Sequence, residues 1–397
     1  MNDIKWQENK MPKTADKNLS IMSIEEVKKA KAFHESFPQY SNTPLAELKE
    51  MSKYLGLGAI KVKDESYRFG LNAFKVLGGS YSMAKYIAQK MGKDVSELPY
   101  DILVYKKLKD EFGQATFFSA TDGNHGRGVA WAANKLGQKC VIFMPKGTTK
   151  IRLNNILKEG ATATIEKYNY DECVRMAADA ASKVKNGVVI QDTAWEGYEE
   201  IPAWIMQGYG TMALESDEQF GEKPTHIFVQ AGVGSLAGAI VGYFSNKYKD
   251  NPPKMIVVEA SAAACLYKGA VAGDGNIRIV DGDLNTIMAG LACGEPNITS
   301  WDILKNHVDC FISAEDIIAA RGMRMLSAPL KGDAQVISGE SGAAPFGALA
   351  TIMLNDEYSE LRKKLDLNSN SKVLLFSTEG DTDPQRWKNI IWEAKNK

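Results

Sequence analysis

The sequence has few cysteines and almost no net charge, and each shortage excludes a class of protein. Its 397 residues include only five cysteines, and no two of them form a Cys-x-x-Cys pair. A disulfide-stapled scaffold, a zinc ribbon and a thioredoxin-type redox motif are therefore excluded. The 48 Lys and Arg residues balance 49 Asp and Glu residues, for a formal net charge of −1. The basic excess that usually marks a nucleic-acid-binding protein is absent.

Long apolar runs that could cross a membrane are also lacking. The stretch 224–246 has no Asp, Glu, Lys or Arg, but it contains four glycines, a proline and a histidine. This composition fits a buried strand, a tight loop and a helix better than a lipid-facing helix. The first 18 residues are polar and charged, without the apolar core of a signal peptide. We therefore expect a cytoplasmic protein that has neither a membrane nor a nucleic-acid partner.

The sequence does contain a regular alternation of short apolar strands and helix-period segments. The expected strands are 59–63, 116–119, 140–144, 163–165, 188–191, 226–230, 255–259 and 373–377. The expected helices are 79–91, 124–136, 149–159, 171–184, 201–216, 235–248, 315–326 and 342–354. This alternation predicts an α/β protein with parallel sheets.

The length of the chain predicts two domains. We expect residues 79–194 to form a smaller domain, because four strand–helix units between 116 and 191 can build a compact lobe. Residues 1–78 together with 195–397 would form a larger domain. Ligands of such folds bind in the cleft between the lobes, at the carboxyl ends of parallel strands.

The first of three segments that suggest chemistry is NAFKVLGGS, residues 72–80, which leads into an expected helix. A lysine among small apolar residues can lose its hydration, which lowers its pKa and frees the amine to form a Schiff base. Lys75 is therefore a candidate nucleophile. The ordinary alternative is a lysine whose charged end reaches the solvent.

The second segment is SATDGNHG, residues 119–126, which runs from a strand end into a helix start. Gly123 allows a tight turn, and backbone amides at the start of a helix bind anions such as a carboxylate. The alternative is a simple turn in which Asp122 or Asn124 caps the helix. His125 could equally be a packed, hydrogen-bonded structural residue.

The third segment is QAGVGSLAG, residues 230–238, again between a strand and a helix. Its glycines let the backbone approach a phosphate closely, and the helix dipole adds to the attraction. A dinucleotide site would look similar, with Glu259 as its ribose ligand. The glycines could also serve only helix–sheet packing. One reactive lysine and two anion sites together are what pyridoxal phosphate (PLP) and an amino-acid substrate require.

The order of these segments resembles the fold-type II PLP enzymes, which include threonine dehydratase, serine racemase and the tryptophan synthase β-subunit. The residues that carry the resemblance are Thr43-Pro44-Leu45, Phe74-Lys75, Gly123-Asn124-His125-Gly126, the glycine loop and Ser377. Three longer strings most closely resemble diaminopropionate ammonia-lyases: ATDGNHGRG from Ala120, QDTAWEGY from Gln191 and FSTEGDTDP from Phe376. The resemblance covers nearly the whole chain.

The resemblance implies an amino-acid-degrading lyase with two open parallel-sheet domains and PLP in the cleft between them. Its expected reaction is the α,β-elimination of D- or L-2,3-diaminopropionate to pyruvate and two ammonia, in a homodimer without a metal. Lys75 would hold the PLP aldehyde, and Asn124 would hydrogen-bond the phenolic oxygen. Ser377 or its neighbour Thr378 would face the pyridine nitrogen, and the position of Gly380 favours Ser377.

The resemblance also assigns two anion sites. The phosphate would lie in a loop of the larger domain formed by Gly232, Val233, Gly234, Ser235, Leu236 and Ala237. The substrate carboxylate would bind in the smaller domain, to the backbone amides of Thr121, Asp122, Gly123, Asn124 and His125.

Asp122 departs from the dehydratases, which carry a neutral serine there. A carboxylate suits a substrate whose β-substituent is an ammonium, because it offers a charge-assisted hydrogen bond and a proton acceptor. Asp192 follows another expected strand and could supply a second carboxylate, or it could cap the segment 195–198. Lys75, Asp122 and Asp192 are thus the expected catalytic residues.

Two rival functions remain compatible with the sequence. The nearer one is a serine or threonine dehydratase or racemase on the same fold, and the more distant one is an NAD-dependent dehydrogenase. A non-catalytic binding protein would not need Lys75. Among the cysteines, Cys265 and Cys293 lie in expected loops, so they would be the pair to approach each other if any did. Five free thiols are the ordinary alternative in a reducing cytoplasm.

Overall fold

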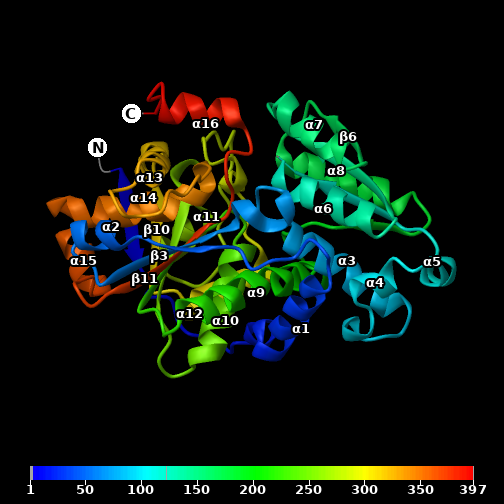
Figure 1. The fold of residues 1–397 in the computed structure, drawn as a ribbon, viewed down its shortest axis with the longest axis horizontal. Coiled ribbons are helices and arrows are strands. Elements are labelled where there is room, and N and C mark those ends of the chain that lie inside the picture. Colours follow the sequence, from blue (N-terminus) through cyan, green and yellow to red (C-terminus); the bar gives the residue numbers. More distant parts are fainter. Residues whose placement is uncertain (1–2, 122, 397) are drawn as a thin grey trace.

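The protein, described by a computed structural model for residues 3–121 and 123–396, is built around two sheets (Figure 1). The larger sheet has the strand order β1-β10-β9-β8-β11-β3-β2, and the smaller one has the order β6-β5-β4-β7. The larger sheet consists of β1 (Ile4–Glu8), β2 (Leu45–Glu47), β3 (Ala59–Asp64), β8 (His226–Gln230), β9 (Lys254–Ala260), β10 (Cys310–Ala314) and β11 (Lys372–Ser377). The smaller sheet consists of β4 (Thr116–Ala120), β5 (Lys139–Met144), β6 (Thr162–Ile165) and β7 (Gly187–Val189).

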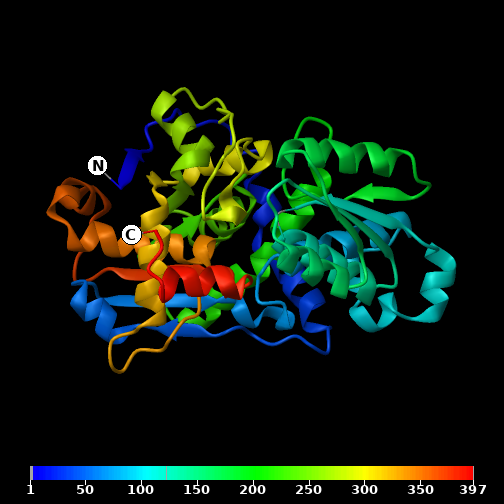
Figure 2. The ribbon, with the colours of Figure 1, turned by 90° about the horizontal axis from the view of Figure 1, so that it is seen from above.

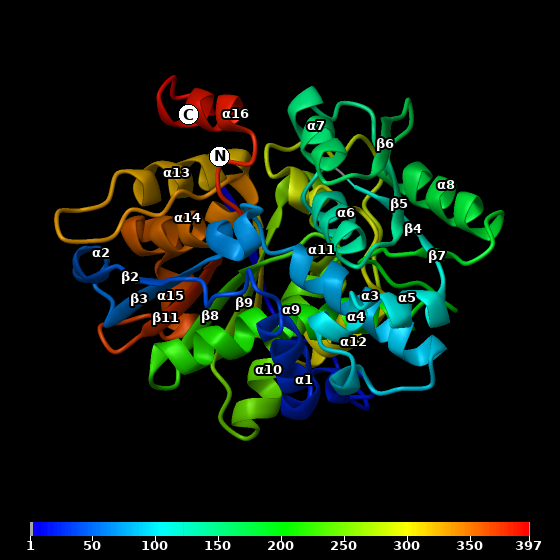
Figure 3. The ribbon, with the colours of Figure 1, turned by 45° about the vertical axis from the view of Figure 1, so that its right-hand side comes forward.

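The larger sheet is parallel except at its two edges, where β1 pairs antiparallel with β10 and β2 with β3. Its central strands are continuous apolar runs because helices cover both faces. Ile227 and Val229 of β8 pack in the core formed with α9 (Glu200–Phe220) and α10 (Ser235–Tyr248). Phe228, between them in sequence, packs with α13 (Asp316–Ser327) and α14 (Glu340–Leu354) on the opposite face. Figure 3 shows these two helix layers on either side of the sheet.

The smaller sheet is parallel throughout and lies in its own lobe beside the larger one (Figure 2). Its helices are α6 (Asn124–Lys135), α7 (Lys150–Lys158) and α8 (Tyr170–Ser182). Helix α3 (Val76–Lys90) packs against both α6 and α9 and so joins the lobes. At this crossing a Cβ on Gly128 would stand 2.7 Å from the backbone nitrogen of Val76. Only glycine allows this approach of α6 to the start of α3.

The remaining helices lie on the outside of the two lobes. They are α1 (Ile24–Glu35), α2 (Lys49–Tyr54), α4 (Tyr100–Leu103), α5 (Lys106–Phe112), α11 (Cys265–Ala272), α12 (Ile298–His307), α15 (Ser359–Leu365) and α16 (Pro384–Ile391). Short 3₁₀ turns connect several of the elements. Among the described residues no helix is both long and apolar enough to span a bilayer.

Each strand and helix expected from the sequence pattern is present, with shifts at the ends. Helix α3 begins at Val76, directly after Lys75, rather than at residue 79, and β7 ends at Val189 rather than at residue 191. The pattern did not predict β1, β2 and β10, nor the outer helices. The α/β architecture with parallel sheets is confirmed.

A fully buried cluster of four charged side chains anchors the segment that leads to Lys75. The Nε atom of Arg68 lies 2.8 Å from Glu65 Oε2, and its second guanidinium nitrogen lies 2.7 Å from Glu215 Oε2 on α9. Lys63 Nζ lies 2.6 Å from the same Glu215 oxygen. Burial by itself raises the pKa of Glu215, but Arg68 and Lys63 lower it to about 2. The four charges thus compensate one another inside the larger lobe.

Replacing Arg68 by Met should destabilise the protein by about 3–5 kcal/mol, because it removes the cation beside buried Glu65 and leaves Glu215 with Lys63 alone. Urea-induced unfolding of the two proteins at pH 7.5 measures the change. Arg278→Met is the matched control, since Arg278 forms its ion pair with Asp274 at the surface. That control should leave the free energy of unfolding nearly unchanged. Equal stability of Arg68→Met and the wild type would contradict a stabilising role of the cluster.

Candidate active site

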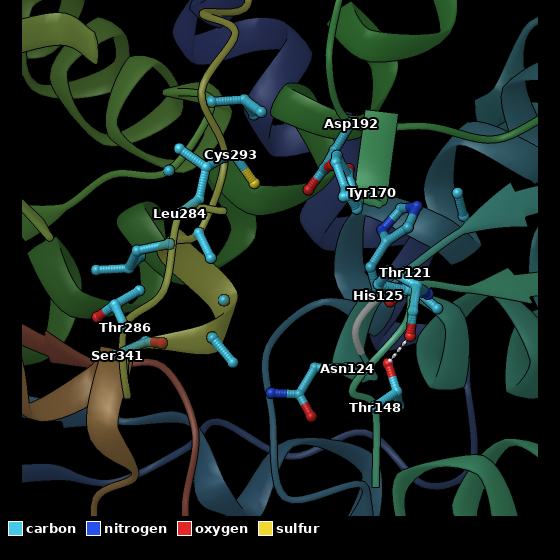
Figure 4. A pocket seen from close by; sticks show the side chains of 18 of the residues that line it. Thr121, Asn124, His125, Thr148, Tyr170, Asp192, Leu284, Thr286, Cys293 and Ser341 are labelled. Atoms are coloured by element: carbon cyan, nitrogen blue, oxygen red, sulfur yellow. Dashed lines mark hydrogen bonds between the residues drawn. The ribbon is translucent and has the colours of Figure 1, made fainter. Parts of the chain in front are cut away.

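A cavity of about 440 Å³ lies between the two lobes, at the carboxyl ends of strands from both sheets. Thr121 follows β4 on one wall, while Gln230 ends β8 and Thr378 follows β11 on the other. This is the position at which α/β folds bind ligands. Figure 4 shows the labelled side chains of both walls facing one another across the space. Those labelled in the figure are Thr121, Asn124, His125, Thr148, Tyr170, Asp192, Leu284, Thr286, Cys293 and Ser341.

Lys75 stands at the start of α3 on the cavity wall, and its Nζ forms an ion pair with Oδ2 of Asp192. The Tyr209 hydroxyl donates to the same oxygen at 3.4 Å. Burial alone would lower the pKa of Lys75, but the attraction of the Asp192 carboxylate outweighs it and raises the pKa. Burial alone would raise the pKa of Asp192, but the attraction of the Lys75 ammonium outweighs burial and lowers the pKa to about 2. The surface-lysine alternative therefore does not hold.

Asp192 is held through its backbone as well as its side chain. Its carbonyl oxygen accepts a hydrogen bond from Ser235 Oγ and another from Asn297 Nδ2 at 3.2 Å. Asp192 does not cap a helix, because α9 begins only at Glu200. The residue that follows the smaller sheet is thus fixed to the glycine loop of the larger lobe.

The second segment forms the opposite wall. Thr121, Asn124 and His125 line the cavity, Gly123 does not, and Asp122 lies outside the described residues. Thr121 Oγ1 accepts hydrogen bonds from the backbone nitrogens of Gly123 at 2.9 Å and Gly126 at 3.0 Å, which fixes the turn.

Two side chains of this wall already have protein partners. Nε2 of His125 lies 2.9 Å from the carbonyl oxygen of Ile190, a contact that fits the structural interpretation of this histidine. Asn124 Nδ2 donates to Glu379 Oε2 across the cavity at 2.5 Å.

The third segment is the N-terminal turn of α10. Gly232, Val233, Gly234, Ser235 and Leu236 line the cavity, whereas Ala237 lies one position deeper in the helix. Gly234 has φ 103°, a backbone conformation that favours glycine. The start of this 14-residue helix therefore faces the cavity with its positive dipole end, as an anion site requires.

Glu259 does not belong to this site. It is fully buried, and its two oxygens accept hydrogen bonds from the backbone nitrogens of Leu266 at 2.9 Å and Tyr267 at 2.6 Å, at the start of α11. Burial raises the pKa of Glu259 to about 8. A dehydrogenase using the glycine loop would lack its ribose ligand.

The structure separates the two candidates for the ring nitrogen contact. Ser377 is fully buried, and its hydroxyl donates to Ser338 Oγ at 2.8 Å. Thr378 lies on the cavity wall, where its Oγ1 accepts from Gln230 Nε2 at 2.7 Å. The side chain in reach of a bound ligand is therefore Thr378.

Several cavity residues were not assigned a role from the sequence. They are Tyr170, Gln230, Cys293, Ser341 and Glu379. Glu379 is part of the string FSTEGDTDP and Gln230 opens the third segment, so their position at a strand end was the available signal. No disulfide joins any of the five cysteines in the part of the chain that the structure describes. Cys265 Sγ contacts the backbone oxygen of Cys293 at 3.8 Å, so these two segments do lie side by side without a disulfide.

The polar groups of the wall fit a phosphorylated, aldehyde-bearing aromatic ligand such as PLP. A helix N-terminus faces the space for a phosphate, and a buried amine is available for a covalent link. Gln230 Oε1 and Ser341 Oγ are buried on the wall and lack a hydrogen-bond partner among the described residues. A polar ligand in the cavity would satisfy such atoms.

Comparison with known proteins identifies the class first: the chain belongs to the pyridoxal-phosphate dependent enzyme family, whose model matches residues 37–379. PLP is accordingly its cofactor. The chain is 50% identical over 370 residues to the diaminopropionate ammonia-lyase of Salmonella typhimurium, covering 92% of this chain and 91% of that protein. It is 46% identical over 380 residues to the Escherichia coli enzyme of the same name, covering 95% of this chain and 94% of that enzyme.

Solved structures agree with these relatives. The crystal structure of the E. coli diaminopropionate ammonia-lyase in complex with D-serine matches with a TM-score of 0.91 and 44% identity, over 99% of this chain and 98% of that chain. A threonine deaminase from Solanum lycopersicum shares the fold. It matches with a TM-score of 0.70 and 19% identity, over 97% of this chain and 96% of that chain. The fold-type II architecture and the resemblance found in the sequence are confirmed.

In the cofactor-free protein, Asp192→Asn should lower the pKa of Lys75, because burial then acts without the opposing carboxylate. A larger fraction of the amine is neutral at a given pH, so covalent attachment of added PLP should reach its half-maximal rate at a lower pH. Stopped-flow absorbance across a pH series measures this midpoint.

Asp171→Asn is the control, since Asp171 also lines the cavity but, within the described part of the chain, forms no ion pair with Lys75. The control should keep the wild-type midpoint. An unchanged midpoint in Asp192→Asn would show that the ion pair does not set the basicity of Lys75.

Proposed function

We propose that this protein is a diaminopropionate ammonia-lyase, a PLP-dependent carbon–nitrogen lyase that converts D- and L-2,3-diaminopropionate to pyruvate and two ammonia. The observation that carries the proposal is the 46–50% identity to such enzymes along almost the whole chain. The threonine dehydratase of Staphylococcus saprophyticus matches at 26% identity over 68% of this chain, which makes the dehydratase alternative the weaker one.

Different cavity residues would bind different groups of PLP. Lys75 would hold the aldehyde, the loop Gly232 to Leu236 with Ala237 behind it would hold the phosphate, and Asn124 would reach the phenolic oxygen. Thr378 would take the ring nitrogen, because Ser377 is turned towards Ser338. When bound, PLP delocalises the electron pair that remains on the substrate Cα after its proton is removed.

The charged groups of the chain would move the protons. Lys75, once its amine is free, can remove the Cα proton on one face of the substrate. The Asp192 carboxylate lies against this amine and would hold the departing β-ammonium. Asp122 follows Thr121 in the sequence and would serve the opposite enantiomer. Backbone amides from Thr121 to His125 would bind the substrate carboxylate.

The resemblance also supports a homodimer that degrades amino acids in the cytoplasm, without a nucleic-acid or membrane partner. The near-zero net charge is in keeping with a small-molecule partner. We further infer that residues 79–194 are the smaller domain and residues 1–78 with 195–397 the larger one. In support, the strands of the smaller sheet all lie between residues 116 and 189.

The proposal is tested by incubating the purified, PLP-loaded protein with D- and L-2,3-diaminopropionate and, separately, with serine and threonine. A diaminopropionate ammonia-lyase releases pyruvate and ammonia from diaminopropionate in a ratio of one to two. Faster turnover of serine or threonine, with one ammonia for each keto acid, would favour the dehydratase alternative instead.

Lys75→Ala should abolish covalent attachment of PLP and nearly all turnover, because it removes the amine that would form the Schiff base. PLP should still bind non-covalently through its phosphate. Borohydride reduction followed by peptide mass mapping measures the covalent link, with Lys146→Ala, a second lysine of the cavity wall, as the control. A PLP-modified lysine remaining in Lys75→Ala would disprove the assignment.

Asp122→Asn should impair turnover of the D-isomer most, and Asp192→Asn that of the L-isomer. General acid–base contributions set the expected loss at about 10²- to 10⁴-fold. The measurement is kcat/KM for each enantiomer with each variant. Equal losses of kcat/KM on both enantiomers would show that the two carboxylates only bind the substrate ammonium. Unchanged kcat/KM values would show that they take no part in the mechanism.

A further inference from the structure

Gln230 is a buried amide on the cavity wall whose orientation is fixed by its neighbours. Only 1% of the residue is exposed. Its Nε2 lies 3.1 Å from the carbonyl oxygen of Phe376 and 2.7 Å from Thr378 Oγ1. A carbonyl oxygen can only accept, so the amide atom beside Phe376 must be the nitrogen. Both N–H groups of Gln230 are then engaged, one by each partner.

This geometry determines the direction in which the Thr378 hydroxyl donates. Because Oγ1 accepts from Gln230, the single hydroxyl proton cannot point towards that amide. Thr378 lines the cavity, so the proton is left to point into it. The backbone oxygen of Thr378 accepts from Phe74 nitrogen at 3.1 Å, which fixes the residue to the segment that carries Lys75.

We propose that Gln230 is a positioning residue that fixes Thr378 as a hydrogen-bond donor to the ring nitrogen of bound PLP. The proposal rests on the placement of the PLP ring against Thr378 in the proposed function. A nitrogen that accepts this bond carries no proton of its own. The bound ring is therefore the neutral pyridine, and Gln230 controls its electronic state without touching it.

The test uses PLP labelled with ¹⁵N at the ring nitrogen and bound to the full-length protein. The variants are Gln230→Met, which keeps the length of the side chain without its donors, Thr378→Val, which removes the hydroxyl, and the double variant. Gln207→Met is the matched control, because Gln207 is another buried amide whose Nε2 bonds to Ile21 oxygen away from the cavity. The readouts are the ¹⁵N chemical shift and the dissociation constant of PLP.

In the wild type we expect the shift of an unprotonated, hydrogen-bonded pyridine nitrogen. Gln230→Met and Thr378→Val should each move the shift towards that of a pyridine without a donor and weaken PLP binding about tenfold. Since Gln230 acts through Thr378, the double variant should bind PLP no more weakly than Thr378→Val alone. Gln207→Met should match the wild type in both readouts.

A protonated ring nitrogen in the wild type would overturn the proposal, and this measurement needs no variant to fold. Losses in affinity that multiply in the double variant would also overturn it, because Gln230 would then contact PLP independently, through its unpartnered Oε1. Neither readout depends on the substrate. A protein that shows the expected shift but does not convert diaminopropionate would contradict the proposed function and leave this inference standing.

Discussion

The ion pair between Lys75 and Asp192 is the interaction on which the site depends, because it joins segments that are far apart in the chain. Lys75 opens α3, which packs against both lobes, and Asp192 follows the smaller sheet. The Asp192 carbonyl oxygen is in turn bound by Ser235, the first residue of α10. The side chain of Asp192 thus fixes the Lys75 amine, and its backbone fixes the glycine loop at the start of α10. Neither charge could be buried in this cleft without the other.

The same rule of paired buried charges extends away from the cavity. Arg68 lies between Glu65 and Glu215, and Lys63 completes the cluster beneath the segment that runs to Lys75. Glu259 is satisfied differently, by two backbone amides at the start of α11. Where the wall instead leaves polar atoms unpartnered, as at Gln230 Oε1 and Ser341 Oγ, the cavity faces them.

The relatives assign this cavity to PLP-dependent chemistry, and the residues of this chain indicate which substrate suits it. The fold is shared with a threonine deaminase at 19% identity, so the architecture does not select the substrate. The similarity to a diaminopropionate ammonia-lyase is far higher, at 50% identity over 92% of this chain. The Asp192 carboxylate beside Lys75 is the physical feature that suits a substrate with an ammonium on its β-carbon.

The sequence by itself determined the alternation of strands and helices, and it singled out Lys75 and the two strand-to-helix turns that line the cavity, because these patterns depend on residues close together in the chain. It did not reveal β1, whose residues IKWQE mix charged and apolar side chains and become a strand only by pairing with β10. The polar helix α1 was missed for a similar reason: its few apolar residues are buried only against α9 and neighbouring helices.

Tertiary structure alone decided that Asp192 pairs with Lys75 rather than capping a helix, and that Thr378 rather than Ser377 faces the cavity. It also decided that Glu259 is committed to α11. Which partner a polar side chain meets depends on how distant segments pack, and adjacent residues at a strand end point in opposite directions.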